Sequence, residues 1–277
     1  MKRLLLLLAV LAVVAAAAVA LWPHTPTAAT GQNNTDPRPL SATEQAAFLP
    51  LVCGGAGAGS GGYAHSCTSL PGYPSSDYGG AGTGLGITLT SVAYGNFTGG
   101  DEAYVSYQGS FEPHATNFGG GLLFARNGTG WTLSGWQPGN SMDNCLVVNR
   151  QGTTPFLCAR GSTGQGETDT LLGVWRANSA SPVRTLVTAT DLRGTMNPNA
   201  NCASVKPGQA VLVEIDGVSR EGDALSAEAD YIPGSLVQPL CAAHEFGAAT
   251  PITLYLPVSA GAASVQMPAG ISFAAAP

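Results

Sequence analysis

The sequence predicts an all-β fold, and three observations support this prediction. Short apolar stretches recur from residue 87 onward, and Gly, Asn, Asp or Pro separates nearly all of them, as in short strands joined by turns. The 37 glycines and 19 prolines make up about a fifth of the 277 residues. Only 10% of the residues are charged, which is too few for a protein of long surface helices. We therefore expect propeller-like repeats of short antiparallel strands, with a β-sandwich as the alternative.

One short helix is expected before the strands begin. Ser41 and Glu44 have the spacing of a capping box, and the apolar stretch that follows ends near Pro50. This is the only substantial helix that the sequence predicts. The expected strands cover residues 87–93, 103–107, 121–126, 131–136, 146–149, 154–159, 170–176, 183–189, 210–215, 224–231 and 252–258, with two short ones at 265–267 and 271–273.

The first 22 residues have the form of an export signal. Lys2 and Arg3 precede an uninterrupted apolar stretch, and Ala18 and Ala20 fit a small-x-small cleavage pattern. The alternative is an uncleaved anchor, because residues 4–22 are long enough to cross a bilayer as a helix. In both cases the rest of the chain is extracytoplasmic, either periplasmic or secreted or tethered to the inner membrane. Membrane contact is expected only through residues 4–22, if they are retained.

A linker is expected between this segment and the folded domain. Residues 23–40 contain four prolines together with Thr, Asn, Gln and Gly, a composition that does not bury a core. We therefore divide the chain into a signal peptide or anchor at 1–22, a linker at 23–40 and one all-β domain at 41–277.

Six cysteines in an exported chain predict three disulfides. Cys145 and Cys158 lie at equal distances from Gln151-Gly152, so a hairpin turning there would place them opposite each other. Cys53 and Cys67 flank a glycine-rich loop and are expected to pair. Cys202 and Cys241 then pair by elimination. A zinc site is not expected, because there is no C-x-x-C motif and no closely spaced histidine pair.

The charge balance argues against nucleic-acid binding. The chain has 11 basic and 17 acidic residues, and the longest basic run is the Lys2-Arg3 pair. A nucleic-acid-binding protein needs a basic patch that displaces counterions from phosphates. With only two lysines, the abundant Ala, Gly, Pro and Arg indicate a GC-rich bacterial genome.

A repeat-like layout covers about residues 87–136. After the strand at 87–93 comes the turn NFTG at 96–99, followed by Asp101 and Glu102, a second strand, and a Gly-rich hairpin ending in a Trp-containing strand. A similar turn, DLRG, lies 95 residues further on at 191–194, about two propeller blade lengths away. This layout resembles the FG-GAP or VCBS-type repeats of integrin-like β-propellers. The resemblance implies a propeller that recognises a protein or a polysaccharide.

The acidic residues after this turn are candidates for calcium binding in that family. Where its calcium-binding members carry carboxylates at alternate turn positions, this chain has Asn96, Thr98 and Gly100. Asp101 and Glu102 alone supply too few hard oxygen ligands. We therefore expect no bound metal and no cofactor, and keep Asp101 and Glu102 as candidate binding residues.

A second candidate site lies in the expected loop at 110–118. The spacing of Glu112 and His114 could place two ligand-binding side chains together, and Phe111 and Phe118 flank them. The surrounding region also carries Tyr and Trp residues that would form either a binding surface or the core between strands; these are Tyr94, Tyr104, Tyr107, Trp131 and Trp136.

These observations favour a non-catalytic binding or cell-envelope interaction module. Its partner would be an envelope protein or polysaccharide that the sequence does not identify. The main alternative is a secreted hydrolase acting on an envelope or extracellular polymer through Glu112, His114 and nearby acids; a purely structural envelope protein is the third. No G-x-S-x-G motif occurs, so the sequence gives no sign of a serine hydrolase.

Overall fold

The computed structural model describes residues 33–54, 63–75, 85–109, 111–112, 118–164, 167–190, 205–243, 249–259 and 262–266. This part of the chain is mostly β-structure in open antiparallel sheets. Each larger sheet is formed mainly by strands that follow one another along the chain, so short turns make most of the connections.

The first sheet has six strands. Its centre is a meander from β3 to β6, and β1 and β2 both pair with β3. The strands are β1 (Arg38–Pro39), β2 (Tyr63–Cys67), β3 (Leu85–Gly95), β4 (Glu102–Gly109), β5 (Gly119–Asn127) and β6 (Gly130–Pro138). In the tight turn between β5 and β6, Gly128 takes a φ of 58°, which a two-residue hairpin turn requires at its first central position.

The second and third sheets continue the same pattern. The second sheet has the order β10-β9-β8-β7, and the third has the order β11-β12-β13. A small hairpin of β14 and β15 follows. The strands are β7 (Cys145–Val147), β8 (Phe156–Gly164), β9 (Glu167–Trp175), β10 (Arg184–Thr190), β11 (Val211–Glu221), β12 (Ala224–Ile232), β13 (Thr250–Tyr255), β14 (Val258–Ser259) and β15 (Ala262–Ala263).

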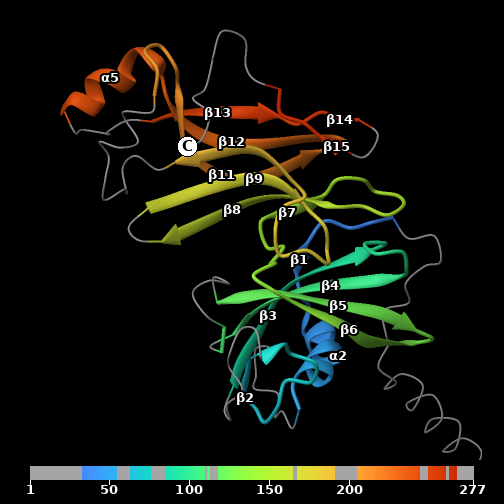
Figure 1. Ribbon diagram of the computed structural model, residues 1–277. Coiled ribbons are helices and arrows are strands. Elements are labelled where there is room, and N and C mark those ends of the chain that lie inside the picture. The colour runs from blue at the N-terminus through green and yellow to red at the C-terminus, as the bar shows by residue number, and fades with distance from the viewer. Residues whose placement is uncertain are drawn as a thin grey trace, which may run out of the picture.

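The three sheets form a stack with a helix at each end (Figure 1). Helix α2 (Ala42–Val52) packs on the outer face of the first sheet, and α5 (Gly234–Ala243) packs on the outer face of the third. Because successive side chains of a strand point to opposite faces of the sheet, each strand contributes to the two layers on either side of it. On β4, Val105 faces the α2 side, whereas Tyr104 faces the second sheet.

A separate layer of apolar side chains fills each space between the sheets. We call the layer between the first and second sheets the junction core; it consists of Ala93, Phe97, Tyr104, Leu123, Met142, Cys145, Val147, Phe156, Cys158, Trp175 and Ala177. On β8, Phe156 belongs to the junction core, whereas Leu157 belongs to the layer shared with the third sheet. Burial of both sheet faces therefore explains why the strands are rich in apolar residues.

The strands expected between residues 87 and 258 all overlap observed strands, β3 to β13. Of the expected strand at 265–267, residues 265 and 266 are described; they form no strand, and Gln266 makes an isolated bridge to Tyr255. The one at 271–273 lies outside the described residues. Strands β1 and β2 were not expected from the pattern.

The helix prediction was correct at the N-terminal end and incomplete elsewhere. Ser41 caps α2, and its capping box with Glu44 is formed. Pro50 does not end the helix, which continues to Val52. Helix α5 contradicts the expectation of a single substantial helix. It begins at Gly234 and contains Pro239, two residues that disfavour a helix locally, although Val237, Leu240 and Cys241 form one apolar face against the third sheet.

Two of the three predicted disulfides are present. Cys53 pairs with Cys67 and Cys145 with Cys158. Cys145 is directly opposite Cys158 in the β7–β8 ladder, so the predicted hairpin register is confirmed. The third predicted bridge involves Cys202, which lies outside the described residues, so the Cys202–Cys241 pairing stays a prediction.

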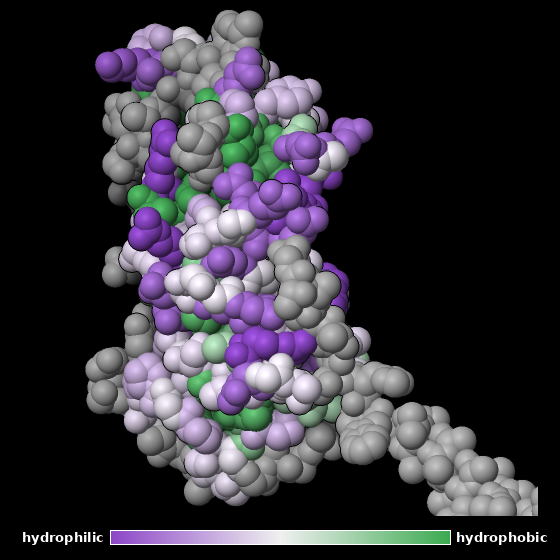
Figure 2. Space-filling model, turned by 90° about the vertical axis from the view of Figure 1, so that its right-hand side faces the viewer, coloured by the Kyte–Doolittle hydropathy of each residue, from purple (hydrophilic) through white to green (hydrophobic). Residues whose placement is uncertain are grey.

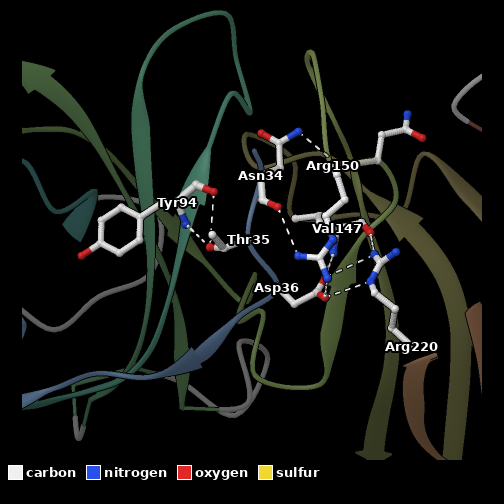
Figure 3. Close-up of polar contacts among 8 residues, drawn as sticks. Asn34, Thr35, Asp36, Tyr94, Val147, Arg150 and Arg220 are labelled. Atoms are coloured by element: carbon white, nitrogen blue, oxygen red, sulfur yellow. Dashed lines mark hydrogen bonds and ion pairs between the residues drawn. The ribbon is translucent and has the colours of Figure 1, made fainter. Parts of the chain in front are cut away.

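Part of the expected linker belongs to the fold. We call residues 33–40 the strap. It contributes β1 and buries both Asn34 and Leu40, contrary to the expectation that residues 23–40 form a linker outside the core. Its polar side chains compensate for its low hydrophobicity by hydrogen bonding to both neighbouring sheets, and Figure 3 shows it between Tyr94 on one side and Arg150 and Arg220 on the other.

One face of the molecule is polar across its middle. Figure 2 shows hydrophilic residues over most of this middle region, and hydrophobic residues toward both the upper and the lower end. Among the described residues, no helix is long and apolar enough to cross a membrane. The apolar segment at 4–22 lies outside them.

Candidate functional site

The candidate residues from the sequence do not form one site. Asp101 and Glu102 lie at the start of β4, whereas Phe111 and Glu112 follow its end. An eight-residue strand spans roughly 26 Å, so the two groups lie at opposite ends of the first sheet. His114 lies outside the described residues, and its relation to Glu112 stays a prediction.

Glu102 holds the turn between β3 and β4 together. Its carboxylate accepts hydrogen bonds from the backbone N–H groups of Phe97 and Thr98, both at 2.7 Å, and from the Thr98 hydroxyl. Glu102 is 5% exposed, so these contacts compensate for burying its charge. Both carboxylate oxygens are used inside the turn, which assigns Glu102 a structural role.

Glu112 is also buried, in an aromatic environment. It is 3% exposed and accepts a hydrogen bond from the Tyr107 hydroxyl. Burial, together with this hydrogen bond to Glu112, raises the pKa of Tyr107 well above its usual value, so the phenol stays protonated as a donor. Phe111 packs against Tyr73 and Trp136, with ring centroids 5.0 and 6.4 Å away.

The aromatic residues of this region are core residues, not a binding surface. Six of the seven named from the sequence are buried: Tyr94, Tyr104, Tyr107, Phe111, Trp131 and Trp136. Phe118 is the exception, with 44% exposure and a φ of 57° that is rare for an aromatic residue. The structure therefore favours the core interpretation for all of them except Phe118.

A groove that the sequence analysis missed lies where the first and second sheets meet. Its volume is about 530 Å³, within the range of small-molecule sites. We call it the junction groove; it is lined by Phe97, Thr98, Thr153, Thr154, Pro155, Val174, Arg176, Asn178, Val183, Arg184 and Ala263. Apolar side chains and polar donors both line it, so it can bind a ligand that has polar and apolar parts.

Two loops form adjacent walls of the junction groove and are hydrogen-bonded to each other. The β3–β4 turn supplies Phe97 and Thr98, and the β7–β8 connection supplies Thr153 and Thr154. The N–H of Thr154 donates to the Asn96 carbonyl at 3.0 Å, and the Thr153 hydroxyl donates to the Asn96 side chain at 3.1 Å. The two walls are therefore held at a fixed spacing.

The strap is hydrogen-bonded to both of these loops. The Asn34 side chain accepts a hydrogen bond from the Asn96 N–H at 2.8 Å and donates to the carbonyls of Asn149 and Gly152 at 3.0 and 2.9 Å. Asn34 is 1% exposed, and every one of these contacts reaches a loop that forms the groove. Ordering of the groove therefore depends on the strap.

The far side of the groove comes from the β9–β10 hairpin. Arg184 begins β10 and lies opposite Val174 of β9, and Arg176 follows the end of β9. Val174 lies two residues before Arg176, so both arginines come from the end of the hairpin where β9 leads into β10. Both guanidinium groups are exposed and line the groove.

The turn at 96–99 supplies two residues of this groove, but no short motif in the sequence marks the groove as a whole. Its lining residues extend from Phe97 to Ala263 and come together only when the first and second sheets stack. Comparisons with protein-family models, with curated proteins and with solved structures found no match to the chain.

Proposed function

We propose that the chain is an exported, non-catalytic binding module of the cell envelope, and that the junction groove is its ligand site. The observation that carries this proposal is the chemistry of the groove. Its described lining contains no carboxylate, imidazole or thiol, whereas general acid–base or nucleophilic catalysis on a polymer needs such groups. The groove instead offers hydroxyl oxygens as acceptors, together with amide and guanidinium donors, which suit recognition.

The architecture supports a propeller-like arrangement as part of this proposal. Consecutive meanders stack face to face in chain order, as blades do in FG-GAP-type propellers. The turn that resembles the family's repeat supplies Phe97 and Thr98 to the groove. The second copy of that turn, at 191–194, lies outside the described residues.

An extracytoplasmic location is also part of the proposal. Two disulfides suit an oxidising compartment. The export signal or anchor at 1–22 would deliver the module there, and the partner would be an envelope polysaccharide or protein.

The hydrolase alternative has less support. Glu112 would have to act on substrate, but it is 3% exposed and already bonded to Tyr107. Alanine substitution of Glu112 and His114 tests it, because loss of turnover on envelope polymers would favour the enzyme.

A matched pair of tryptophan variants tests the binding proposal. Val183 lines the junction groove and is 51% exposed, and Leu236 lies on α5 and is 47% exposed. We expect Val183→Trp to fill the groove and reduce retention on envelope polysaccharide fractions at least tenfold, while Leu236→Trp leaves retention unchanged. Equal retention by the two variants would contradict the groove as the site, and release of cleaved polymer by the unmodified protein would contradict a non-catalytic role.

A further inference from the structure

Most arginines of the described chain are used inside the fold. Seven of the nine arginines lie in the described part. Four of them form ion pairs with carboxylates: Arg38–Glu44 at 2.6 Å, Arg150–Asp36 and Arg220–Asp36 at 2.9 Å, and Arg126–Asp101 at 4.0 Å.

A fifth arginine, Arg160, is held by the junction core. Its guanidinium donates to the Asn140 side chain at 2.7 Å and lies 4.4 Å from the centre of the Trp175 ring. Burial lowers the pKa of Arg160 to about 10. This cation is therefore already engaged in contacts inside the fold, and it does not line the junction groove.

The remaining two, Arg176 and Arg184, have no carboxylate partner among the described residues. The chain has a net charge of −6, so acidic side chains are in excess. Yet both of these arginines line the same groove, at the end of the hairpin where β9 leads into β10. The only side-chain hydrogen bond that the structure gives either of them within its described part is from Arg184 to the Ala263 carbonyl, at 3.4 Å.

We infer that the ligand of the junction groove is an anionic saccharide whose carboxylate or phosphate binds between Arg176 and Arg184. This inference rests on the proposed function of the groove. A guanidinium group presents planar paired donors that match a carboxylate or a phosphate, and two of them in one groove favour an anion. The other polar lining residues, Thr98, Thr153 and Asn178, offer the groups that hydrogen bond to sugar hydroxyls.

Calorimetric titration with three probes of equal length tests the inference. The probes are a tetrasaccharide of uronic acid, a phosphorylated tetrasaccharide and a neutral tetrasaccharide, each titrated at low and at physiological ionic strength. We expect at least one charged probe to bind tenfold or more tightly than the neutral one, with affinity that falls as salt screens the charges. The charged probe that binds more tightly identifies the anionic group as a carboxylate or a phosphate.

Single glutamine variants localise the effect. Arg176→Gln and Arg184→Gln are each expected to lower the affinity for the charged probe five- to tenfold and to reduce the salt dependence of its binding. The matched control is Lys206→Gln, which removes one exposed positive charge that does not line the groove. We expect Lys206→Gln to leave the affinity for the charged probe and its salt dependence unchanged. Arg184→Lys, which keeps the charge but loses the planar donor pair, is expected to have an intermediate affinity.

The outcomes separate this inference from the proposed function. If the neutral probe binds as tightly as the charged ones and the two glutamine variants bind normally, while Val183→Trp abolishes binding, the anionic ligand is wrong and the groove is still the site. If Val183→Trp retains envelope polysaccharide as well as the unmodified protein does, and no probe binds, both proposals fail. Thermal unfolding of each variant verifies that the binding data come from folded protein.

Discussion

At the scale of single residues, Asp36 joins parts of the chain that are far apart in sequence. One of its carboxylate oxygens accepts from the Val147 N–H at 2.9 Å and from Arg220 at 3.2 Å. The other accepts from Arg220 and from Arg150, both at 2.9 Å. Arg220 also donates to the Val147 carbonyl. Figure 3 shows these contacts converging on the strap.

We expect Asp36→Asn to destabilise the fold by about 2–4 kcal/mol. The substitution keeps the size of the side chain but removes the charge that compensates Arg220, whose side chain is 8% exposed. Chemical denaturation measures the change. The control is Asp101→Asn, because Asp101 is 44% exposed and 4.0 Å from Arg126. Loss of this longer contact to an exposed carboxylate should cost less than about 1 kcal/mol, and an equal loss in both variants would refute the role of Asp36.

Glu44 gives the fold a specific dependence on acid. Burial alone would raise the pKa of Glu44, but hydrogen bonds from Arg38, from the backbone and hydroxyl of Ser41 and from Tyr94 together lower it to about 2. A pKa below the unfolded value, about 4.3, means that the ionised group stabilises the folded state. This contribution is fully present above about pH 4.5 and is lost as the pH falls toward 2.

Replacing Glu44 with Gln should remove much of this dependence. We expect Glu44→Gln to be less stable than the unmodified protein at neutral pH by about 1–3 kcal/mol, and the difference to shrink between about pH 4.5 and pH 2. Denaturant unfolding at a series of pH values measures it. Glu228→Gln, which changes an exposed carboxylate bonded to Thr253, is the control and should keep the acid dependence of the unmodified protein. A constant difference across this range would contradict the assignment to Glu44.

Predictions for single residues were correct where they depended on near neighbours in the sequence. They were wrong where they depended on tertiary packing. The capping box of Ser41 and Glu44 is a short-range pattern, and it is formed. Glu112 had the residue type of a catalytic or binding group, but its burial beside Tyr107 depends on packing that its neighbours in sequence do not reveal. Arg176 and Arg184 stand out only after the partners of the other described arginines are known.

At the scale of elements, the β7–β8 hairpin was predictable because its register follows from two cysteines and a turn. The pairs Leu146–Leu157 and Val147–Phe156 flank the disulfide, and the N–H of Val148 donates to the Pro155 carbonyl at 2.9 Å. The ladder is therefore specified by several apolar pairs as well as by the covalent bond.

Removing that disulfide should lower stability without changing the register. We expect the Cys145→Ala and Cys158→Ala double variant to lose about 3 kcal/mol, because the bridge closes a loop with a sequence separation of 13 residues. Hydrogen exchange should still protect the N–H groups of β8, since the flanking pairs hold them. A loss of stability below about 1 kcal/mol, or loss of protection throughout β8 in folded protein, would contradict this expectation.

Two elements were missed for different physical reasons. The strap has the proline and polar content of a linker, and its stability comes from partners more than 50 residues away, such as Tyr94 and Arg150. Helix α5 contains Gly234 and Pro239, which disfavour a helix locally, and it forms where the third sheet offers an apolar surface around Val213 and Ile232. In both cases tertiary contacts stabilise a segment that local preference would leave irregular.

At the scale of the whole molecule, the strap connects the layers of the stack. It pairs with β3 through β1, it bonds to the β7–β8 connection through Asn34, and it bonds to Arg220 of β11 through Asp36. All three sheets therefore share one polar connection in addition to the apolar layers between them. The junction groove lies where this connection supports the loops of two sheets.

Comparing chains that begin at residue 33 and at residue 41 tests this role of the strap. Both keep the capping box of α2, but only the first keeps β1, Asn34 and Asp36. We expect the longer chain to unfold in one denaturant transition, because strap and junction core couple the sheets. In the shorter chain, hydrogen exchange should be faster in β7 and β8 than in β4 and β5. The core between α2 and the first sheet is kept, whereas the second sheet loses its hydrogen bonds to the strap.

The shorter chain should also lose affinity for the groove ligand, because Asn34 no longer fixes the loops at Asn96 and Gly152. Equal exchange in the two sheets together with unchanged binding would mean that the apolar layers alone hold the stack.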